Sequence, residues 1–253
     1  MSNISNTLFM GKVLIRYNSL KSTNLEAQNL LAAGSQIEGT VIVASVQTEG
    51  KGQRSNTWHS PANTNLLSSF IIFPKFLLPR QQFMLNIITS LAMVDLLESL
   101  GIRKAHIKWP NDIYCEKLKI AGILIQNNIS AQAIQSSIIG IGLNVNQADF
   151  DSKLPNPTSL KRILKQDLDL DFVLKQLCFF LEKRYLQLKN TSHALLCQQY
   201  TERLFRLGKV ATYLIDEKPV AGIIEGINPL GKLIVRLEDK TRIFDFQEIR
   251  FLL

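Results

Sequence analysis

The 253-residue chain has little cysteine and little histidine, and neither residue is spaced as a metal site would need. Its three cysteines, Cys115, Cys178 and Cys197, are widely separated, and no CxxC pair occurs. An odd number of scattered thiols argues against a disulfide framework and predicts free thiols in a reducing compartment. The three histidines show no ligand spacing either, so we interpret them as structural.

Long apolar segments and a secretory leader are also absent from the sequence. The apolar runs are interrupted well before the roughly 20 residues that span a bilayer. The N-terminal MSNISNTLFMGK has no basic region followed by an apolar one. We therefore expect a cytoplasmic protein without membrane contact. The GxxxxGK[ST] pattern is missing too, so any bound ATP would need a cradle other than a P-loop.

Hydrophobic residues make up 46% of the chain and charged residues 20%, which is the composition of a globular protein with a packed core. The length allows one large domain, or a medium domain with a small one. The formal net charge is +8. This excess suits an anionic partner such as a nucleotide or nucleic acid, and it also fits a surface that is simply basic.

Hydrophobic patterning predicts an α+β protein in two parts. Short apolar and β-branched runs predict strands at 12–17, 40–46, 65–73, 104–110, 111–117, 119–126 and 136–146. A helical period predicts helices at 22–34, 80–101, 172–188 and 194–205, with a loop at 151–165. Closely spaced strands predict a mixed sheet with helices on one face. From Gly208 onward, short strands separated by turns predict a small β-barrel, so we place the boundary between residues 1–206 and 207–253.

The first predicted helix begins with the residues STN. Thr23 followed by Glu26 fits a capping box, and Gly34 fits the stop signal after the last turn. The cap leaves hydroxyl and amide groups at a helix N-terminus, where they could hold a neutral polar ligand head. Capping alone explains these residues as well, so both interpretations stay open.

The segment QTEGKGQRSNTW combines flexibility, positive charge and one large flat ring. Gly50 and Gly52 let backbone amides approach a ligand and can form an anion-binding nest. Lys51 and Arg54 add positive charge, and Trp58 offers a flat face to a purine or another planar ring. This chemistry fits a nucleotide, with its phosphate on the amides and cations. A solvated basic hairpin with an anchoring tryptophan is the alternative.

The segment KWPNDIY places a lysine at the end of an apolar strand. Lys108 there can act as a charge clamp on a carboxylate or phosphate. Asp112 could hold Mg²⁺ together with substrate phosphates. The alternative is a solvated lysine followed by two turn-forming residues.

Two apolar strands, KIAGILIQ and SSIIGIGLNVN, carry glycines in their interiors. Glycine weakens a strand unless something must approach the backbone closely. A pocket for an apolar ligand above Gly122, Gly140 and Gly142 would supply that reason, with Asn144 as a polar anchor at the strand end. A bulge or close packing explains the glycines equally well.

Taken in order and spacing, these segments resemble the biotin protein ligases. The pattern of that family is an STN-type helix start, a Gln followed by a GRGRxGRxW-like loop, then KWPND, KxAGIL and GxGxN. This chain reads STN, Q-TE-GKGQRSNTW, KWPND, KIAGIL and GIGLN. The match spans roughly residues 13–250, and its motifs are dense between 22 and 146. The resemblance implies a class II synthetase-like mixed sheet flanked by helices, with an SH3-like barrel at the C-terminal end.

The resemblance also implies an activity. Such a ligase joins biotin to ATP with Mg²⁺, giving biotinyl-5′-AMP and pyrophosphate, and passes biotin to a lysine of a biotin carboxyl carrier protein domain. Members with an N-terminal helix-turn-helix repressor domain exist in this family. Because the present chain begins at the catalytic segment, the resemblance implies no DNA binding. A homodimer stays open.

The resemblance assigns ligand-binding residues one by one. Those that would contact biotin or ATP are Ser22, Thr23, Asn24, Gln47, Gly50, Lys51, Gly52, Gln53, Arg54, Trp58, Lys108, Asn111, Gly122 and Asn144. The STN segment and Gln47 would hold the ureido end of biotin, and the glycine-rich loop would wrap biotin and the α-phosphate. Trp58 would stack on adenine. Lys108, with Arg54, would be the catalytic cation between carboxylate and phosphate, and Asp112 would hold Mg²⁺.

The loop departs from the family pattern at three positions. Lys51 and Gln53 stand where the pattern has arginines, and Asn56 stands at the place of the last one. These changes remove guanidinium forks that suit an acyl-adenylate. The sequence therefore leaves open how tightly the intermediate is retained.

Two alternative functions stay open, one with the same fold and one of another class. A lipoate or octanoate ligase or transferase of the same core would also use a lysine, although KWPND and the tryptophan at the end of the loop favour biotin. A non-catalytic nucleic-acid binder would fit the positive charge and the β-rich tail. That function predicts aromatic residues interleaved with lysine and arginine on strands, whereas the aromatic residues of the tail are spaced as core residues are.

Overall fold

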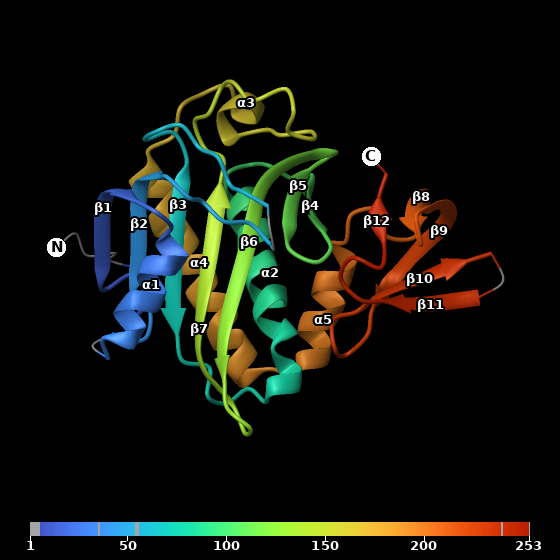
Figure 1. Ribbon diagram of the computed structural model, residues 1–253, viewed down its shortest axis with the longest axis horizontal. Coiled ribbons are helices and arrows are strands. Elements are labelled where there is room, and N and C mark those ends of the chain that lie inside the picture. The colour runs from blue at the N-terminus through green and yellow to red at the C-terminus, as the bar shows by residue number, and fades with distance from the viewer. Residues whose placement is uncertain (1–5, 35, 54–55, 239, 253) are drawn as a thin grey trace.

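The computed structural model describes residues 6–34, 36–53, 56–238 and 240–252. Two β-sheets form its frame, a seven-stranded sheet in the larger part of the chain and a five-stranded sheet at the C-terminal end (Figure 1). Helices flank the larger sheet. The predicted α+β architecture with a C-terminal β unit is confirmed.

The larger sheet has the strand order β1-β2-β3-β7-β6-β5-β4. Its strands are β1 (Leu14–Leu20), β2 (Val41–Gln47), β3 (Leu66–Ile72), β4 (Ala105–Lys108), β5 (Asp112–Cys115), β6 (Leu118–Ile129) and β7 (Ile134–Leu143). β1 and β2 are connected by the crossover helix α1 and pair in parallel, and the other neighbouring strands pair antiparallel. The sheet is therefore mixed, as the strand pattern predicts.

Helices cover both faces of this sheet. α2 (Phe83–Ser99) and α4 (Leu170–Asn190) lie behind it in Figure 1, and α5 (His193–Glu202) lies beside α2. A short 3₁₀ turn, Pro79–Gln81, precedes α2. α2 is predominantly apolar and buried along most of its length, as expected for a helix packed between a sheet and other helices. α1 (Thr23–Ala32) lies on the opposite face, where Ala27 packs with Ile42, Ile71 and Ile138. The prediction that all helices share one face is thus wrong for α1.

The first turn of α1 differs from the predicted capping box. Its N-cap is Ser22, whose side chain makes no capping hydrogen bond. The backbone N–H and the hydroxyl of Thr23 both donate to Oε1 of Gln47, at 2.7 and 3.0 Å. Glu26 accepts a hydrogen bond from the Tyr17 hydroxyl instead of returning to the cap. A side chain from the end of β2 therefore satisfies the helix start, while Gly34, with φ of +79°, ends the helix as predicted.

The segment predicted as a loop at 151–165 contains a short helix, α3 (Leu160–Leu164). Ser159 caps it, because its Oγ accepts a hydrogen bond from the N–H of Arg162 at 3.2 Å. Five residues are too few to show a helical period in the sequence. The cap, rather than periodicity, starts this turn.

The C-terminal sheet has the order β11-β10-β9-β8-β12, and its neighbouring strands pair antiparallel. Its strands are β8 (Val210–Ile215), β9 (Lys218–Ile227), β10 (Leu233–Leu237), β11 (Lys240–Phe244) and β12 (Arg250–Phe251). Trp109 ties this sheet to the larger one: its Nε1 donates to the carbonyl of Gly231 at 2.8 Å, and its ring meets Phe246 edge-on. The two sheets therefore meet beside the end of β4.

The cysteines are free, with Cys115 and Cys178 buried and Cys197 partly buried, as the sequence predicts. Burial raises the pKa of the Cys178 thiol to about 12. Among the described residues, no helix combines the length and the apolar character that crossing a bilayer requires.

Candidate active site

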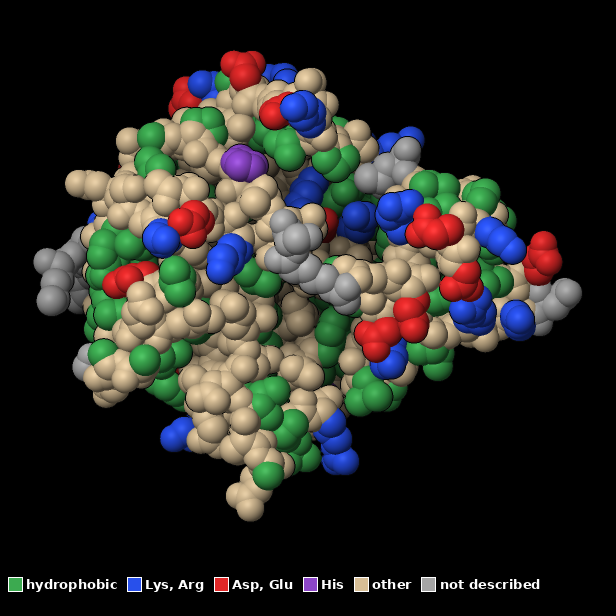
Figure 2. Space-filling model, in the orientation of Figure 1, with side chains coloured by type: hydrophobic (Ala, Val, Ile, Leu, Met, Phe, Trp, Pro, Cys, Tyr) green, Lys and Arg blue, Asp and Glu red, His purple; other side chains and the backbone are tan. Residues whose placement is uncertain are grey.

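A cavity of about 680 Å³ opens where the larger sheet meets the C-terminal sheet. Figure 2 shows a hollow at this junction with lysine and arginine side chains gathered beside it. Most residues that the sequence singled out line this cavity. They are Ser22, Thr23, Asn24, Gln47, Lys51, Gly52, Gln53, Trp58, Lys108, Asn111, Asp112 and Gly122. Segments far apart in the chain thus come together at one site.

One end of the cavity is a network of uncharged polar side chains. Thr23 donates to Gln47, and the hydroxyl of Ser69 lies 2.7 Å from Oγ1 of Thr23 and 2.6 Å from Oδ1 of Asn24. Nδ2 of Asn24 donates to Oε1 of Gln126 at 2.9 Å. Because a hydroxyl carries one proton, Ser69 can donate to Thr23 or to Asn24 at any moment. This end offers both donors and acceptors to a neutral polar group.

The floor of the cavity explains the strand glycines. A Cβ on Gly142 would lie 2.5 Å from Cε2 of Trp58, and one on Gly122 would lie 3.1 Å from Cζ3 of the same ring. A Cβ on Gly140 would collide with the side-chain amide of Asn24. Only glycine leaves room for these neighbours without displacing them. Close packing, the alternative interpretation, thus explains these glycines in this structure, and the approaching groups are Trp58 and Asn24. A ligand above the glycines stays a prediction.

The loop between β2 and β3 forms a small hairpin over β6 and β7 (Figure 1). Trp58 N–H donates to the carbonyl of Gly50 at 2.9 Å, and Gly52 N–H donates to the carbonyl of Asn56 at 2.8 Å. The amide of Gly52 is therefore used inside the hairpin, so the predicted anion-binding nest is not formed through it here. Gly50 does not line the cavity; a Cβ there would collide with the carbonyl of Trp58.

Two buried polar atoms of this hairpin face no protein partner among the described residues. They are Nε1 of Trp58 and Oε1 of Gln53. A buried polar atom without a hydrogen bond costs free energy, so such atoms mark places where water or a ligand is expected. Both residues line the cavity. Arg54, predicted as catalytic, lies outside the described residues.

Lys108 ends β4 with its ammonium group between two aromatic rings. Nζ lies 5.4 Å from the ring centroid of Tyr114 on β5 and 5.4 Å from that of Phe251 on β12. Its side chain is 21% exposed, and Oδ2 of Asp112 lies 3.9 Å away. Burial lowers the pKa of Lys108 from the 10.5 of an ordinary lysine, and nearby cations lower it too, while Asp112 opposes the change. The C-terminal sheet thus contributes a wall to this cation site.

The carboxylate of Asp112 is already paired. Its Oδ1 accepts from Nζ of Lys119 at 2.6 Å, and its other oxygen faces Lys108. Within the described ranges, no group of three histidine, cysteine or acidic side chains is placed to hold a metal ion. Mg²⁺ requires an octahedral oxygen shell, usually one or two carboxylates with phosphates. One carboxylate between two ammonium groups fits that requirement poorly and suits the ordering of two lysines better, so Asp112 as a Mg²⁺ ligand stays a prediction.

The two predicted asparagines have different surroundings. Asn111 lines the cavity, and its Nδ2 donates to the carbonyl of Ile123 on β6 at 2.6 Å. Asn144 is buried but does not line the cavity; its Nδ2 donates to the carbonyl of Thr158 at 2.9 Å. The structure therefore brings Asn111 to the site and leaves Asn144 behind it.

Sequence reasoning missed several residues at this site. Lys119 lines the cavity, pairs with Asp112, and lies 5.8 Å from the Trp58 ring centroid. The sequence could have indicated Lys119, because this residue begins the KIAGIL motif, which follows KWPND after one tight turn. Ser69 and Phe251 gave no local signal, since their contacts join residues far apart in the chain.

Residues 17–144, about half of the chain, match the sequence pattern described as the biotin/lipoate A/B protein ligase family.

The chain belongs to this family. Among curated members, the bifunctional ligase/repressor BirA of Bacillus subtilis is 36% identical over 182 residues, which is 71% of this chain and 55% of that protein. The chain thus spans about half the length of this relative. The biotin--[acetyl-CoA-carboxylase] ligase of Mycobacterium tuberculosis is 29% identical over 225 residues, which is 87% of this chain and 82% of that protein.

Solved structures of family members share the whole fold. The biotin protein ligase of Aquifex aeolicus in complex with biotin and ATP is 25% identical and has a TM-score of 0.79. The alignment covers 95% of this chain and 99% of that chain. The similarity therefore includes the C-terminal sheet as well as the larger sheet.

Proposed function

We propose that this protein is a biotin protein ligase. In this proposal it joins biotin to ATP, giving biotinyl-5′-AMP and pyrophosphate, and then transfers biotin to a lysine of a biotin carboxyl carrier protein domain. The observation that carries the proposal is a cavity that combines an uncharged polar end, a planar ring and a cluster of cations. These three parts suit a neutral polar ring head, a purine base, and a carboxylate beside a phosphate.

Biotin, rather than lipoate, is supported by the similar proteins. The family description includes both acids, so membership alone does not choose between them. The relative from Mycobacterium tuberculosis and the solved structure from Aquifex aeolicus are biotin ligases by name. The polar network of Thr23, Asn24 and Gln47 also suits a ureido group, which donates and accepts hydrogen bonds. A dithiolane ring has no N–H group for such a network to recognise.

The first step would rest on positioning and charge. A carboxylate oxygen of biotin attacks the α-phosphorus of ATP, the bond to the bridging oxygen breaks, and pyrophosphate leaves with that oxygen. Negative charge grows on the phosphate as two anions approach. Lys108 and Lys119 place two ammonium groups on the cavity wall, and Asp112 orders them. Fixed cations in a partly buried site stabilise this charge without reorganisation.

The second step would use the same geometry with AMP as the leaving group. The ε-amine of the carrier lysine attacks the acyl carbon of biotinyl-5′-AMP, the bond from this carbon to the phosphate oxygen breaks, and the amine gives its proton to solvent. The cations that stabilise the first step then stabilise the departing phosphate. We propose Arg54 as a further cation of the loop. We also propose that Mg²⁺ accompanies the ATP phosphates.

The hairpin over β6 and β7 would close on the ligands. Trp58 offers a ring for adenine. Its Nε1 and Oε1 of Gln53, both without a partner among the described residues, lie where ligand atoms could complete their hydrogen bonds. Gln53 has no guanidinium with which to grip the phosphate, so retention of the intermediate would depend on Lys51 and Arg54.

The proposal extends to the organisation of the chain and its surroundings. It includes a catalytic part at 1–206 and a C-terminal part at 207–253. It also includes a reducing compartment such as the cytoplasm, which the free thiols support.

Thermal denaturation with defined ligands tests this function. Biotin with ATP should raise the Tm more than either alone, and biotin should elicit pyrophosphate release from ATP. Lipoate with ATP serves as the matched control. Stabilisation and pyrophosphate release with lipoate but not with biotin would replace the proposed substrate. A mobility shift of nucleic acid at micromolar protein, without either response, would favour a binding protein instead.

A further inference from the structure

The backbone of Lys119 is held by a loop that comes much later in the chain. Its N–H donates to the carbonyl of Asn156 at 2.7 Å, and its carbonyl accepts from the N–H of Thr158 at 2.8 Å. Lys119 and Pro157 form a parallel β-bridge between these two bonds. Residues 156–158, which we name the clamp, therefore pair with Lys119 as a short extra strand would.

The larger sheet pairs Lys119 on one side only, with Tyr114 of β5. β6 pairs with β7 from Ala121 onward, so the start of β6 extends beyond the end of β7. On the other side, the pairing of β5 with β6 shifts register beside Tyr114, which leaves Ile120 as an extra residue. An extra residue bends a strand and disrupts its ladder locally. The clamp therefore pairs with Lys119 on the side where β7 has already ended.

Asn144 fastens the clamp to the end of β7. Its side chain is 5% exposed, and its Nδ2 donates to the carbonyl of Thr158 at 2.9 Å. Its backbone N–H donates to the carbonyl of Ile120 at 2.9 Å. One residue thus contacts both neighbours of the Lys119–Pro157 bridge. A buried amide that binds a backbone carbonyl fixes the loop more firmly than solvent contacts would.

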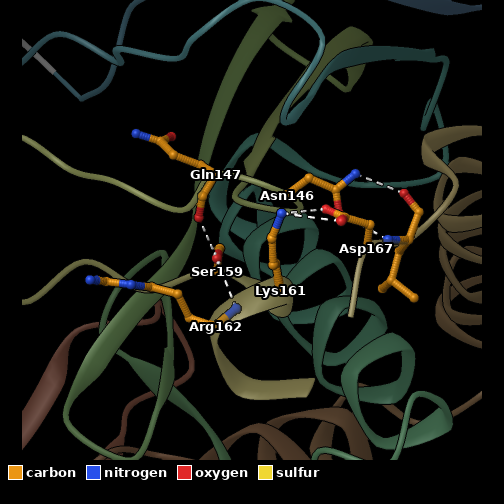
Figure 3. Close-up of polar contacts among 7 residues, drawn as sticks. Asn146, Gln147, Ser159, Lys161, Arg162 and Asp167 are labelled. Carbon is orange, nitrogen blue, oxygen red and sulfur yellow. Dashed lines mark hydrogen bonds and ion pairs between the residues drawn. The ribbon is translucent and has the colours of Figure 1, made fainter. Parts of the chain in front are cut away.

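The far end of the loop is anchored by other polar side chains, which Figure 3 shows. Ser159, fully buried, donates to the carbonyl of Gln147 at 2.6 Å and caps α3. The side chain of Asn146 donates to the carbonyl of Leu168 at 2.8 Å and accepts from its N–H at 2.9 Å. Lys161 pairs with Asp167 at 2.8 Å. A loop fixed at both ends can act as a rigid support rather than a flexible connection.

We propose that Asn144 is a positioning residue of the active site, acting through the clamp on Lys119. It holds the Lys119 backbone so that Nζ stays 2.6 Å from Asp112 and beside Trp58. Asn144 does not line the cavity, so a direct contact with substrate is not part of this proposal. The inference rests on the proposed function for its kinetic consequence, while the clamp itself is a feature of the fold.

The test compares two isosteric variants in the same loop. Asn144→Asp removes the N–H that binds Thr158, and Asn146→Asp removes the N–H that binds Leu168. Both lose one hydrogen bond to a carbonyl, but only the Asn144 bond reaches the clamp directly. In Asn146→Asp, Ser159 and the Lys161–Asp167 ion pair still anchor the far end of the loop. We expect Asn144→Asp to lower kcat for pyrophosphate release about tenfold with KM for ATP and biotin within about twofold, since small misplacement of a reacting group is costly. Asn146→Asp should keep kcat within about twofold at a similar Tm.

A double-mutant cycle separates positioning from general destabilisation. In a Lys119→Met background, Asn144→Asp should cause no further loss of kcat, because the residue it positions is gone. Amide hydrogen exchange should also become faster at Lys119 in Asn144→Asp than in the wild-type chain. If Asn144→Asp does not fold, Pro157→Gly loosens the partly exposed clamp itself, and the same loss of kcat is expected.

Three outcomes would overturn the inference: wild-type kcat in folded Asn144→Asp or Pro157→Gly, losses that multiply in the Lys119→Met background, or full activity of Lys119→Met itself. Failure of the proposed function looks different. The wild-type chain would then release no pyrophosphate with biotin and ATP, while the exchange at Lys119 would still report whether Asn144 holds the clamp.

Discussion

Adding one methyl group at Gly142 should displace Trp58 while leaving the sheet intact. The Cβ of Gly142→Ala would lie 2.5, 2.8 and 2.9 Å from three carbons of the indole, so the face of the ring covers this position. Ordinary carbon contacts are about 3.5 Å, so the ring must move by about 1 Å. β7 cannot yield, because it is paired with β3 and β6 on both sides. Trp58 can move instead, because it is partly exposed and lies on a small hairpin.

The expected effect falls on the nucleotide rather than on the fold. Stacking of a base on an aromatic ring contributes about 1–3 kcal/mol, which corresponds to a factor of about 5 to 150 in affinity. Because the displaced ring stacks less well on adenine, KM for ATP should rise about 5- to 30-fold in a pyrophosphate-release assay. Binding of biotin alone should change less than about twofold, and the Tm should fall by no more than a few degrees.

Two controls make this prediction specific. Gly122→Ala places its Cβ 3.1 Å from Cζ3 of Trp58, so the same defect should appear in a milder form. Adding Gly142→Ala to Trp58→Ala should have little further effect on KM for ATP, because the ring that causes the clash is absent. An unchanged KM for ATP in Gly142→Ala, together with unchanged tryptophan emission, would refute both the packing argument and the stacking role.

The remaining predictions concern Lys108. Lys108→Met should lower kcat about 100- to 1,000-fold, the usual loss for a positioned charge-stabilising group. The Tm should not fall, because burial already disfavours the ammonium. A large fall in Tm with a modest loss of kcat would contradict this. Since the folded pKa of Lys108 lies below 10.5, the unfolded chain binds more protons between the two values. The contribution of Lys108 to the free energy of unfolding should therefore rise with pH across that window, while kcat/KM falls because the ammonium loses its proton. The same pH dependence of unfolding free energy and of kcat/KM in Lys108→Arg as in the wild-type chain would contradict this, and so would a rise of both quantities with pH. Phe251→Leu removes one ring beside Nζ of Lys108, an interaction worth about 0.5–2 kcal/mol. We expect kcat to fall about 3- to 10-fold in this variant and to stay near the wild-type value in Phe251→Tyr, which keeps a ring. Equal losses of kcat in both variants would show that Phe251 acts through packing alone.

Local patterns predicted most of the fold because they depend on neighbouring residues. The strands carry apolar or β-branched runs, and α2 and α4 are long enough to show a helical period. The position of α1 on the opposite face depends on which residues of β2, β3 and β7 face it, which no local pattern states. The Thr23–Gln47 contact that replaces the predicted cap joins a helix to the end of the next strand. Such long-range contacts override local capping preferences.

The candidate site was predictable where a motif supplies its own chemistry. Trp58 and Lys108 could be singled out from ring, charge and strand end, and both line the cavity. Lys119 was missed because its role depends on the ion pair with Asp112 across a hairpin. Asn144 was expected beside the ligand because it ends a glycine-rich strand, yet its side chain turns toward Thr158. The direction of a side chain at a strand end is set by the loop that packs on it.

Transfer of biotin to a carrier domain tests the central claim most directly. The chain would be incubated with biotin, ATP and a biotin carboxyl carrier domain, and the carrier would be probed with streptavidin. The proposed function predicts a labelled carrier when both small molecules are present, and no label when either is omitted or the acceptor lysine is replaced. An unlabelled carrier under the full conditions, with folded enzyme, would contradict it.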